Sequence, residues 1–254
     1  MSGFETIRVA TDADGIATLA LDRPDKHHAM DGRMIAELTE AAAALGADPG
    51  VRAVVLASSG PSFCAGGDLG WMRAQAAADR AGKIAEAGRL AAMLAALDAL
   101  PKPLIARVQG DVYGGGVGLI AVSDLAIAAE GVRLALTETR LGLIPATIGP
   151  FLVRRMGAGM ARQVFFSGNA FGTDFALRAG LLHEVCAAGE LDGRVRRQAE
   201  AVLKTAPGAV AAAKALCLGL GADPAGDLRA SIAALADRWE SDEAQQRIRA
   251  FLGG

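Results

Sequence analysis

The chain has 254 residues, of which 52% are hydrophobic and 4% aromatic, and its formal net charge is −2. This length fits one large domain, or one domain with a small appendage, and the apolar content is sufficient for a large core. The weakly acidic balance and the lack of a basic run argue against a nucleic-acid partner. No segment resembles a signal peptide or a membrane span, so we expect a cytoplasmic protein without a membrane partner.

Three cysteines, Cys64, Cys186 and Cys217, lie far apart and form no C-x-x-C pair. An odd number of scattered cysteines argues against a disulfide framework and against a zinc site. Free cysteine usually behaves as a small hydrophobic side chain. We therefore expect all three to be buried, and we expect no bound metal.

The N-terminal half alternates between strand and helix patterns. Residues 4–10 and 16–22 alternate polar and apolar side chains around an Asp-Gly turn, which predicts a β-hairpin. Asp31 is placed to cap a helix whose apolar residues recur at helical spacing. A β-branched run at residues 51–58 predicts a buried strand. A glycine-rich loop then precedes a helical pattern from about residue 76 to residue 100.

The C-terminal half continues the alternation and then becomes helical. Buried strands are predicted at residues 103–110 and 123–130, and another begins at residue 132. After Pro145 the pattern is helical, apart from a short strand at residues 182–185. Alternating strands and helices indicate an α/β fold. The chain divides into a core over residues 1–190 and an amphipathic helical segment over residues 191–254.

Two glycine-rich segments each follow a predicted strand. In SFCAGGDL, paired glycines expose main-chain N–H groups to a ligand, and Asp68 is placed to cap the segment after it. In GDVYGGGVG, the glycines begin a helix, where N–H groups have no acceptor within the helix. Ordinary strand-to-helix turns are the alternative interpretation. Neither segment satisfies a dinucleotide or P-loop motif.

Glu138 lies in the mostly apolar segment LTETRLGLIP. One interpretation is a solvated glutamate at the start of a helix. The other is a carboxylate in a dry pocket, whose raised pKa lets it accept and donate a proton. Considered alone, the segment leaves both interpretations open.

Taken together, SFCAGGDL, VQGDVYGGGVGL, SDLAIAAE and ALTETRLGLIP resemble, in this order, the signature segments of the crotonase (enoyl-CoA hydratase/isomerase) superfamily. LDRPDKHHAMD and SDEAQQRIRAFL extend the resemblance over nearly the whole chain. It implies an α/β spiral of β-β-α units with a helical C-terminal trimerisation segment. It further implies a homotrimer or hexamer that acts on an acyl-CoA thioester and needs no cofactor, since coenzyme A is part of the substrate.

The resemblance also assigns site residues. Two main-chain N–H groups hold the thioester enolate oxygen in that family, and the matching positions are Gly67 and Gly115. Glu138 matches the catalytic carboxylate. At Ala146, the main-chain N–H would help to hold a water. The other positions matching substrate contacts are Ala65, Asp68, Leu69, Gly70, Tyr113, Gly118 and Arg140, and those near coenzyme A are Lys26 and Ala29.

One position departs from the family pattern. Hydratases of the family commonly use two glutamates, and the first falls at Gly118, which carries no side chain. Glu138 would then act alone, or with Tyr113 or an ordered water. The local segments are similar to bacterial methylglutaconyl-CoA hydratases, so we expect hydration of a 2-enoyl-CoA. Arg140 then either faces a substrate carboxylate or, as is more usual for arginine, is solvated or paired with a neighbouring acid. The alternatives are a Δ3,Δ2-enoyl-CoA isomerase with Glu138 as single base, and an inactive acyl-CoA-binding scaffold.

Overall fold

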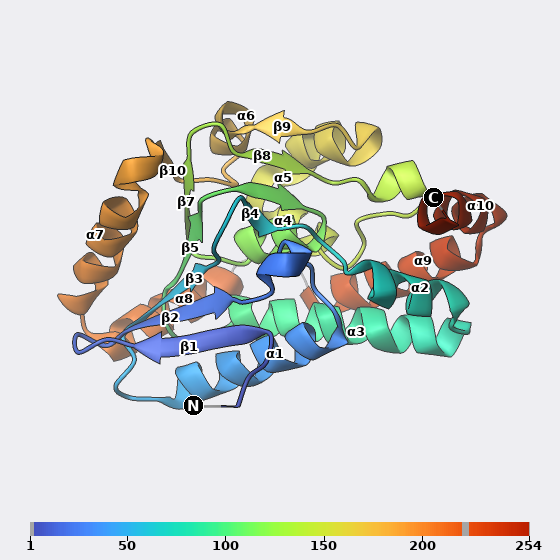
Figure 1. Cartoon of the computed structure of the whole chain (residues 1–254). Coiled ribbons are helices and arrows are strands. Elements are labelled where there is room, and N and C mark those ends of the chain that lie inside the picture. The colour runs from blue at the N-terminus through green and yellow to red at the C-terminus, as the bar shows by residue number, and fades with distance from the viewer. Residues whose placement is uncertain (1–2, 220–223, 254) are drawn as a thin grey trace.

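Two β-sheets form the framework of the protein, and helices surround them (Figure 1). The computed structural model describes residues 3–219 and 224–253. The strands of the larger sheet, in spatial order, are β1 (Ile7–Thr11), β2 (Ile16–Leu21), β3 (Ala53–Ala57), β5 (Leu104–Val108), β7 (Leu125–Ala129) and β10 (Glu184–Cys186). Those of the smaller sheet are β4 (Ser62–Cys64), β6 (Asp111–Tyr113), β8 (Arg133–Ala135) and β9 (Phe171–Gly172).

Helices connect the strands and make up the C-terminal part of the chain. The α-helices are α1 (Gly32–Ala47), α2 (Leu69–Ala77), α3 (Arg80–Asp98), α4 (Gly115–Ala121), α5 (Gly149–Ser167), α6 (Thr173–Arg178), α7 (Leu191–Leu203), α8 (Pro207–Gly219), α9 (Pro224–Glu240) and α10 (Asp242–Gly253). Short 3-10 helices are η1 (Pro24–Lys26), η2 (Glu138–Leu141) and η3 (Ala188–Glu190).

The chain passes three times from the larger sheet to the smaller one and then into a helix. The strand pair β3–β4 leads to α2, the pair β5–β6 leads to α4, and the pair β7–β8 leads through η2 to α5. Successive turns pair in parallel within each sheet, so that β5 lies between β3 and β7, and β6 lies between β4 and β8. Parallel neighbours need crossover connections, which these helices supply. The predicted α/β spiral of β-β-α units is confirmed.

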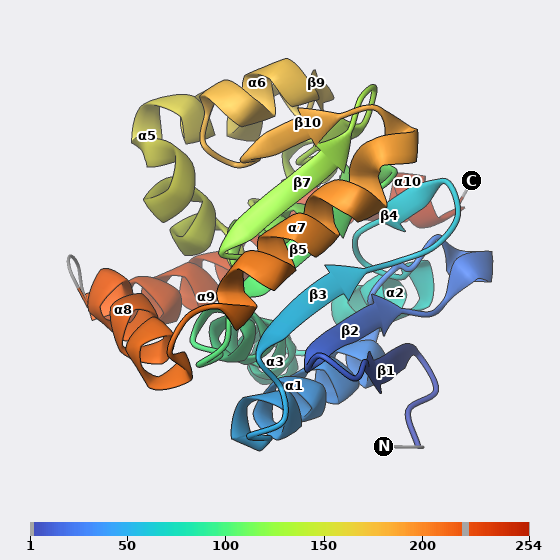
Figure 2. The ribbon, with the colours of Figure 1, turned by 90° about the vertical axis from the view of Figure 1, so that its left-hand side faces the viewer.

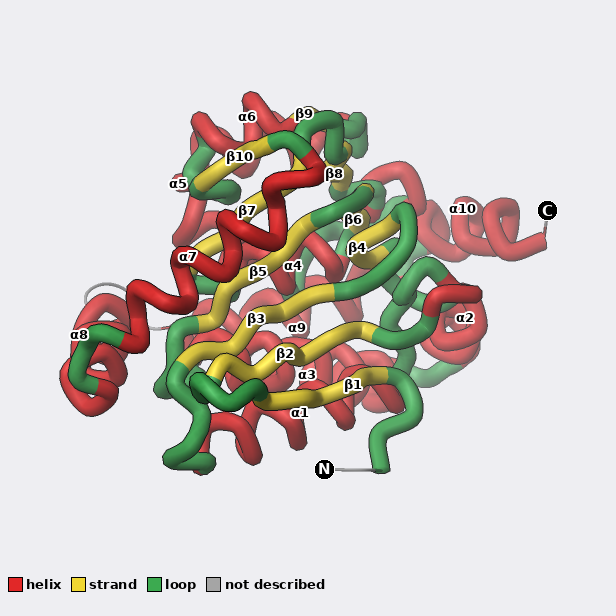
Figure 3. Tube along the Cα trace, turned by 60° about the vertical axis from the view of Figure 1, so that its left-hand side comes forward, coloured by secondary structure: helices red, strands yellow, loops and turns green. Residues whose placement is uncertain are grey.

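Helices cover both faces of the larger sheet (Figures 2 and 3). On one face α1 packs beside α3, and its start is fixed by Asp31, whose carboxylate accepts from the Met34 N–H at 2.9 Å. On the other face α7 crosses β3, β5 and β7. The predicted hairpin is confirmed, because β1 and β2 pair antiparallel with Ile7 opposite Leu21.

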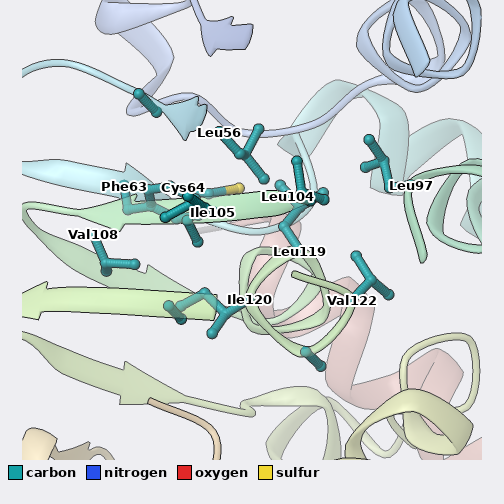
Figure 4. Packing of buried hydrophobic residues seen from close by; sticks show 14 of the residues in the cluster. Leu56, Phe63, Cys64, Leu97, Leu104, Ile105, Val108, Leu119, Ile120 and Val122 are labelled. Atoms are coloured by element: carbon teal, nitrogen blue, oxygen red, sulfur yellow. The ribbon is translucent and has the colours of Figure 1, made fainter. Parts of the chain in front are cut away.

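The core between the sheets surrounds α4. Side chains from β3, β4, β5 and α4 meet there, and Leu56, Phe63, Leu104 and Leu119 are each fully buried (Figure 4). Burial of large apolar side chains is the dominant stabilising contribution to such a core. The packed core therefore holds the start of α4, which carries the second glycine-rich segment, in place.

The helix predicted from about residue 76 to residue 100 is wrong in its limits. Two helices occupy this part of the chain, α2 and α3, and α2 begins seven residues earlier. Each start has its own cap: Asp68 accepts from the Gly70 and Trp71 N–H groups, and Asp79 accepts from the Gly82 N–H. An aspartate cap lets a new helix begin where apolar periodicity alone continues without a break.

Each glycine-rich segment also contains a short strand that the pattern did not predict. β4 and β6 pair with each other in the smaller sheet, with Ser62 opposite Asp111. Strands of three residues are too short to show a period of two, so their pairing depends on the surrounding tertiary structure. The strand predicted at residues 182–185 lies slightly later, at Glu184–Cys186. Cys64 and Cys186 are buried as predicted, whereas Cys217 is exposed.

The C-terminal helices differ in how much they bury. Leu191, Val195 and Ala199 of α7 belong to the main core, so the boundary predicted at residue 190 falls directly before a core helix. α8 has no buried residue, although its sequence is mostly apolar, and Leu216 is 62% exposed. α9 packs on α3 and α5, and α10 packs on α2 and η2. The predicted trimer or hexamer stays a prediction.

In the described part of the chain, no single helix has the length and apolar content of a membrane span. One bent pair, Ala188–Leu203 with Pro207–Gly219 at 107°, meets these two criteria together.

A methyl group added at Gly116 tests how tightly α4 is packed. Its Cβ would lie 2.7 Å from Cβ of Cys64 and 3.0 Å from the Cys64 carbonyl oxygen. Because that backbone is held in β4, we expect Gly116→Ala to lower the free energy of unfolding by about 1–3 kcal/mol. Gly88→Ala, inside α3 with nothing within 4 Å of the new Cβ, should raise it by about 0.5–1 kcal/mol. Urea denaturation measures both, and equal changes would contradict the close packing.

Candidate active site

The first glycine-rich segment is held by the turn that precedes α1. Met30 forms a parallel β-bridge with Gly67. In this bridge the Met30 N–H donates to the Gly66 carbonyl at 2.7 Å, and the Asp68 N–H donates to the Met30 carbonyl at 2.8 Å. Alternate residues of a paired strand direct their main-chain groups to opposite sides, so the Gly67 N–H is turned away from Met30. Gly67 lines the cavity described below.

The second glycine-rich segment places another main-chain N–H beside the first. Gly114 precedes α4 with φ of +48°, which favours glycine, and its N–H donates to the Ala135 carbonyl at 2.9 Å. Gly115 is the first residue of α4, so its N–H has no acceptor within the helix. Gly115 lines the same cavity as Gly67.

The two segments approach each other at main-chain distance. A Cβ at Gly66, where φ is +90°, would lie 3.2 Å from the Tyr113 carbonyl oxygen and 3.8 Å from Cα of Gly114. A Cβ at Gly116 would collide with Cys64 in the same way. Close packing of this kind keeps the relative position of the Gly67 and Gly115 N–H groups fixed.

Glu138 supplies the carboxylate. It begins η2, the element that follows β8, and its Oε1 lies 3.6 Å from the position of a Cβ at Gly114. Its Oε2 is buried and has no hydrogen-bond partner. Burial disfavours the charged form and raises the pKa of Glu138 to about 7, opposed only by a hydrogen bond from its own main-chain N–H. A carboxyl with this pKa both accepts and donates protons readily at neutral pH.

A cavity of about 220 Å³ connects these groups. The described residues that line it are mostly apolar, and Glu138 and Tyr113 are the titratable ones among them. Trp71 and Met72 of α2 line it together with Leu90 of α3. An apolar cavity with a few convergent polar groups is the usual form of a small-molecule site. Ala65 and Leu69, predicted at the substrate, also line it.

The space that a first glutamate would need is filled. A Cβ at Gly118 would lie 2.5 Å from Cγ2 of Ile148 and 3.5 Å from Cδ1 of Leu94. Ile148 is 1% exposed and lines the cavity, whereas Gly118 is buried behind it. The Ile148 side chain therefore fills the space beside Gly118, and Gly118 does not line the cavity.

The prediction that the Ala146 N–H is available to hold a water is wrong. This N–H donates to the Ile144 carbonyl at 2.8 Å, which closes a tight turn around Pro145. Ala146 is buried and does not line the cavity, although its neighbour Thr147 does. Proline fixes φ at residue 145, and this turn follows from it.

Arg140 does not line the cavity, and its predicted contact with a substrate carboxylate stays a prediction. Its side chain is exposed, the guanidinium donates to Oδ1 of Asn169 at 2.9 Å, and its stem lies against Gly168. Although Arg140 follows Glu138 by two residues, the two side chains leave η2 in different directions. The described residues that line the cavity include no lysine, arginine or histidine.

Tyr113 is at the cavity, but its hydroxyl donates to Oδ2 of Asp111 at 3.4 Å. Asp111 in turn forms an ion pair with Arg133 at 2.5 Å. The hydroxyl is therefore engaged by a charged pair, which argues against its use as a second acid beside Glu138.

The remaining predicted residues do not line the cavity. Asp68 caps α2, with its other oxygen 3.3 Å from Arg23, and Gly70 donates its N–H to Asp68. Lys26 is exposed on η1, and Ala29 is buried in the turn before Met30. Substrate contacts of Asp68 and Gly70 and coenzyme A contacts of Lys26 and Ala29 stay predictions.

Several lining residues were not predicted. Met30 lies against Gly115, and the Trp71 ring lies 3.5 Å from the position of a Cβ at Gly67. From the C-terminal helices, Trp239 and Phe251 reach the cavity of their own chain, and α10 packs beside η2 (Figure 1). The helical spacing of apolar residues in this tail was the available signal, but it shows a buried face without showing which partner covers it.

Main-chain donors and a buried carboxyl lie at one apolar cavity, an arrangement that can stabilise developing negative charge and transfer protons. The family model described as enoyl-CoA hydratase/isomerase matches residues 11–246. A putative enoyl-CoA hydratase of Thermus thermophilus is 31% identical over 93% of this chain and 94% of that protein. The crotonyl-CoA hydratase of Syntrophomonas wolfei is 32% identical over 79% of this chain and 76% of that protein.

Solved structures agree in fold. An enoyl-CoA hydratase from Shewanella pealeana superposes with a TM-score of 0.83 at 34% identity, covering 98% of this chain and 94% of that one. The chain belongs to the enoyl-CoA hydratase/isomerase family.

Replacement of Glu138 by glutamine tests the raised pKa. The folded-state pKa of about 7 exceeds the ordinary 4.5, so the folded protein loses stability as the pH rises from about 4.5 through about 7. Glu138→Gln removes this loss. Its free energy of unfolding should match the wild type near pH 4 and exceed it above about pH 8 by on the order of 3 kcal/mol. Denaturation across this pH range measures the difference, and a constant difference would refute the raised pKa.

Proposed function

We propose that the protein is an enoyl-CoA hydratase in which Glu138 is the single acid–base group. The observation that carries this proposal is the buried Glu138 carboxylate, whose Oε2 has no hydrogen-bond partner, in the same cavity as Gly67 and Gly115. A pKa near 7 suits a group that first takes a proton and then returns one. The hydratase names of its relatives support the same reaction.

The reaction has two stages in this geometry. Water adds through its oxygen to C3 of the 2-enoyl thioester while Glu138 accepts one of its protons. The electron pair of the double bond moves to the thioester oxygen, and the Gly67 and Gly115 N–H groups stabilise the resulting enolate. The protonated Glu138 then donates the proton to C2 from the same side, which gives the 3-hydroxyacyl thioester. Removing one such donor typically costs about 3–4 kcal/mol of barrier.

The acyl group that fits best is uncharged and aliphatic. Trp71, Met72 and Leu90 offer apolar contacts, and no cation lines the described cavity to pair with a second carboxylate. Placing an unpaired carboxylate in such surroundings is strongly unfavourable. This argues against methylglutaconyl-CoA as the preferred substrate.

Isomerisation of a 3-enoyl-CoA is the second candidate, favoured by Ile148. Its side chain fills the place of a second carboxylate, and the Ala146 N–H is used within its own turn. A single base that moves a proton from C2 to C4 needs neither group. Glu138 and the two N–H donors serve this reaction in the same roles.

Loss of enoyl absorbance with crotonyl-CoA tests the hydratase. We expect wild-type turnover, and a decrease in kcat of about 10²–10⁴-fold in Glu138→Gln. Glu40→Gln, on the exposed face of α1, is the control and should match the wild type. No turnover with either crotonyl-CoA or 3-methylglutaconyl-CoA would refute hydration. A 3-enoyl-CoA assay would then separate an isomerase from an inactive acyl-CoA-binding scaffold.

The same assay with 3-methylglutaconyl-CoA tests the acyl group. Because the cavity offers no cation, we expect kcat/KM to be at least about tenfold lower than with crotonyl-CoA. A higher kcat/KM with 3-methylglutaconyl-CoA would contradict the preference for an uncharged acyl group. It would indicate that a cationic group outside the described lining contacts the substrate.

A further inference from the structure

His28 is a buried histidine with a backbone conformation that is rare outside glycine. It is 1% exposed, and both it and His27 have positive φ, at 55° and 49°. Its Nδ1 accepts from the Arg23 N–H at 3.1 Å, and its Nε2 lies 2.8 Å from the Ser59 carbonyl oxygen. A carbonyl only accepts, so Nε2 carries the proton and the ring is the neutral tautomer that satisfies both contacts.

These two contacts join the turn at residues 23–30 to the segment that leads into β4. Further bonds connect the same pair of segments. The Cys64 thiol donates to the His28 carbonyl at 3.2 Å, and the Ala65 N–H donates to the His27 carbonyl at 3.0 Å. Next along the chain comes the bridge of Met30 with Gly67. Contacts between the two segments thus run from the imidazole, through the His28 and His27 carbonyls, to the bridge at Gly67.

These contacts between the two segments depend on the positive φ of His28. With φ in the left-handed region, the His28 carbonyl faces Cys64, and two residues later Met30 is in register with Gly67. Most residues disfavour this φ, and the two ring contacts stabilise it together with the main-chain bond from the His28 N–H to the Arg23 carbonyl at 2.9 Å. Arg23 adds to the same arrangement through Asp31 at 3.0 Å and Asp68 at 3.3 Å.

We propose that His28 is a positioning residue for the oxyanion site, because its neutral imidazole fixes the turn that places the Gly67 N–H. The expected effect of His28 on kcat rests on the proposed function. Its expected effect on the position of the Gly67 N–H rests on geometry alone. A donor held in place by His28 stabilises the enolate more than the bound substrate. Its displacement should therefore lower kcat with little effect on KM.

Two variants of His28 separate the contributions. His28→Ala removes both ring contacts, and we expect kcat with crotonyl-CoA to fall about 10–100-fold while KM changes less than about threefold. The Met30 and Asp68 amides should exchange with deuterium at least about tenfold faster, because their bridge opens. His28→Asn tolerates positive φ and keeps an acceptor for Arg23, but it is too short to reach Ser59. It should be intermediate in both measurements.

His183→Ala is the matched control. The Nδ1 atom of His183 also accepts a main-chain N–H, from Ala126 at 2.9 Å, but this bond lies at the start of β7, outside the cavity. Its loss should lower the melting temperature and leave kcat and the exchange of Met30 and Asp68 unchanged. Equal kinetics in His28→Ala and His183→Ala, or unchanged exchange at Met30 and Asp68, would overturn the proposal.

Failure of the proposed function and failure of the positioning role of His28 can be told apart. Without wild-type turnover the proposed function fails, and amide exchange alone decides the role of His28. If His28→Ala does not fold, His28→Asn decides it. Wild-type exchange at Asp68 in that variant would then refute the positioning role.

Discussion

Main-chain contact between two glycine-rich segments is the constraint on which the site depends. Around Gly66 and Gly116 the segments lie so close that a Cβ would meet the Tyr113 carbonyl or Cys64. Parallel pairing of β4 with β6 brings them together, and the core around α4 keeps them there. Two N–H groups on different turns of the spiral thereby acquire a fixed separation. Donors fixed in advance need no reorganisation when negative charge develops between them.

Burial, and not main-chain contact, determines the properties of the Glu138 carboxylate. Glu138 lies in apolar surroundings with one oxygen unpartnered, which is unfavourable for folding and useful for proton transfer. Neighbouring residues keep charged partners away from this carboxyl. Ile148 fills the space beside Gly118, and the Arg140 guanidinium is directed toward Asn169. The C-terminal helices add Trp239 from the same chain. The burial of the Glu138 carboxyl and its raised pKa thus have the same structural origin.

Much of this arrangement was predictable from local sequence. The Asp31 cap, the hairpin and the order of strands and helices follow from composition and periodicity, while the fold family and the roles of Gly67, Gly115 and Glu138 came from a resemblance. The features that were missed depend on tertiary contacts. The direction of the Arg140 side chain and the packing of Ile148 against Gly118 arise between segments that are distant in the sequence. The bond of the Ala146 N–H arises from turn geometry. Strands as short as β4 carry no period of their own.

The central claim is that the N–H groups of Gly67 and Gly115 and the carboxyl of Glu138 act on one thioester. A crystal structure with acetoacetyl-CoA, whose acyl group readily forms an enolate, tests it most directly. We predict the thioester oxygen within about 3 Å of both main-chain nitrogens, and C2 beside the Glu138 carboxyl. A thioester bound elsewhere, or one that contacts only one of the two nitrogens, would contradict it.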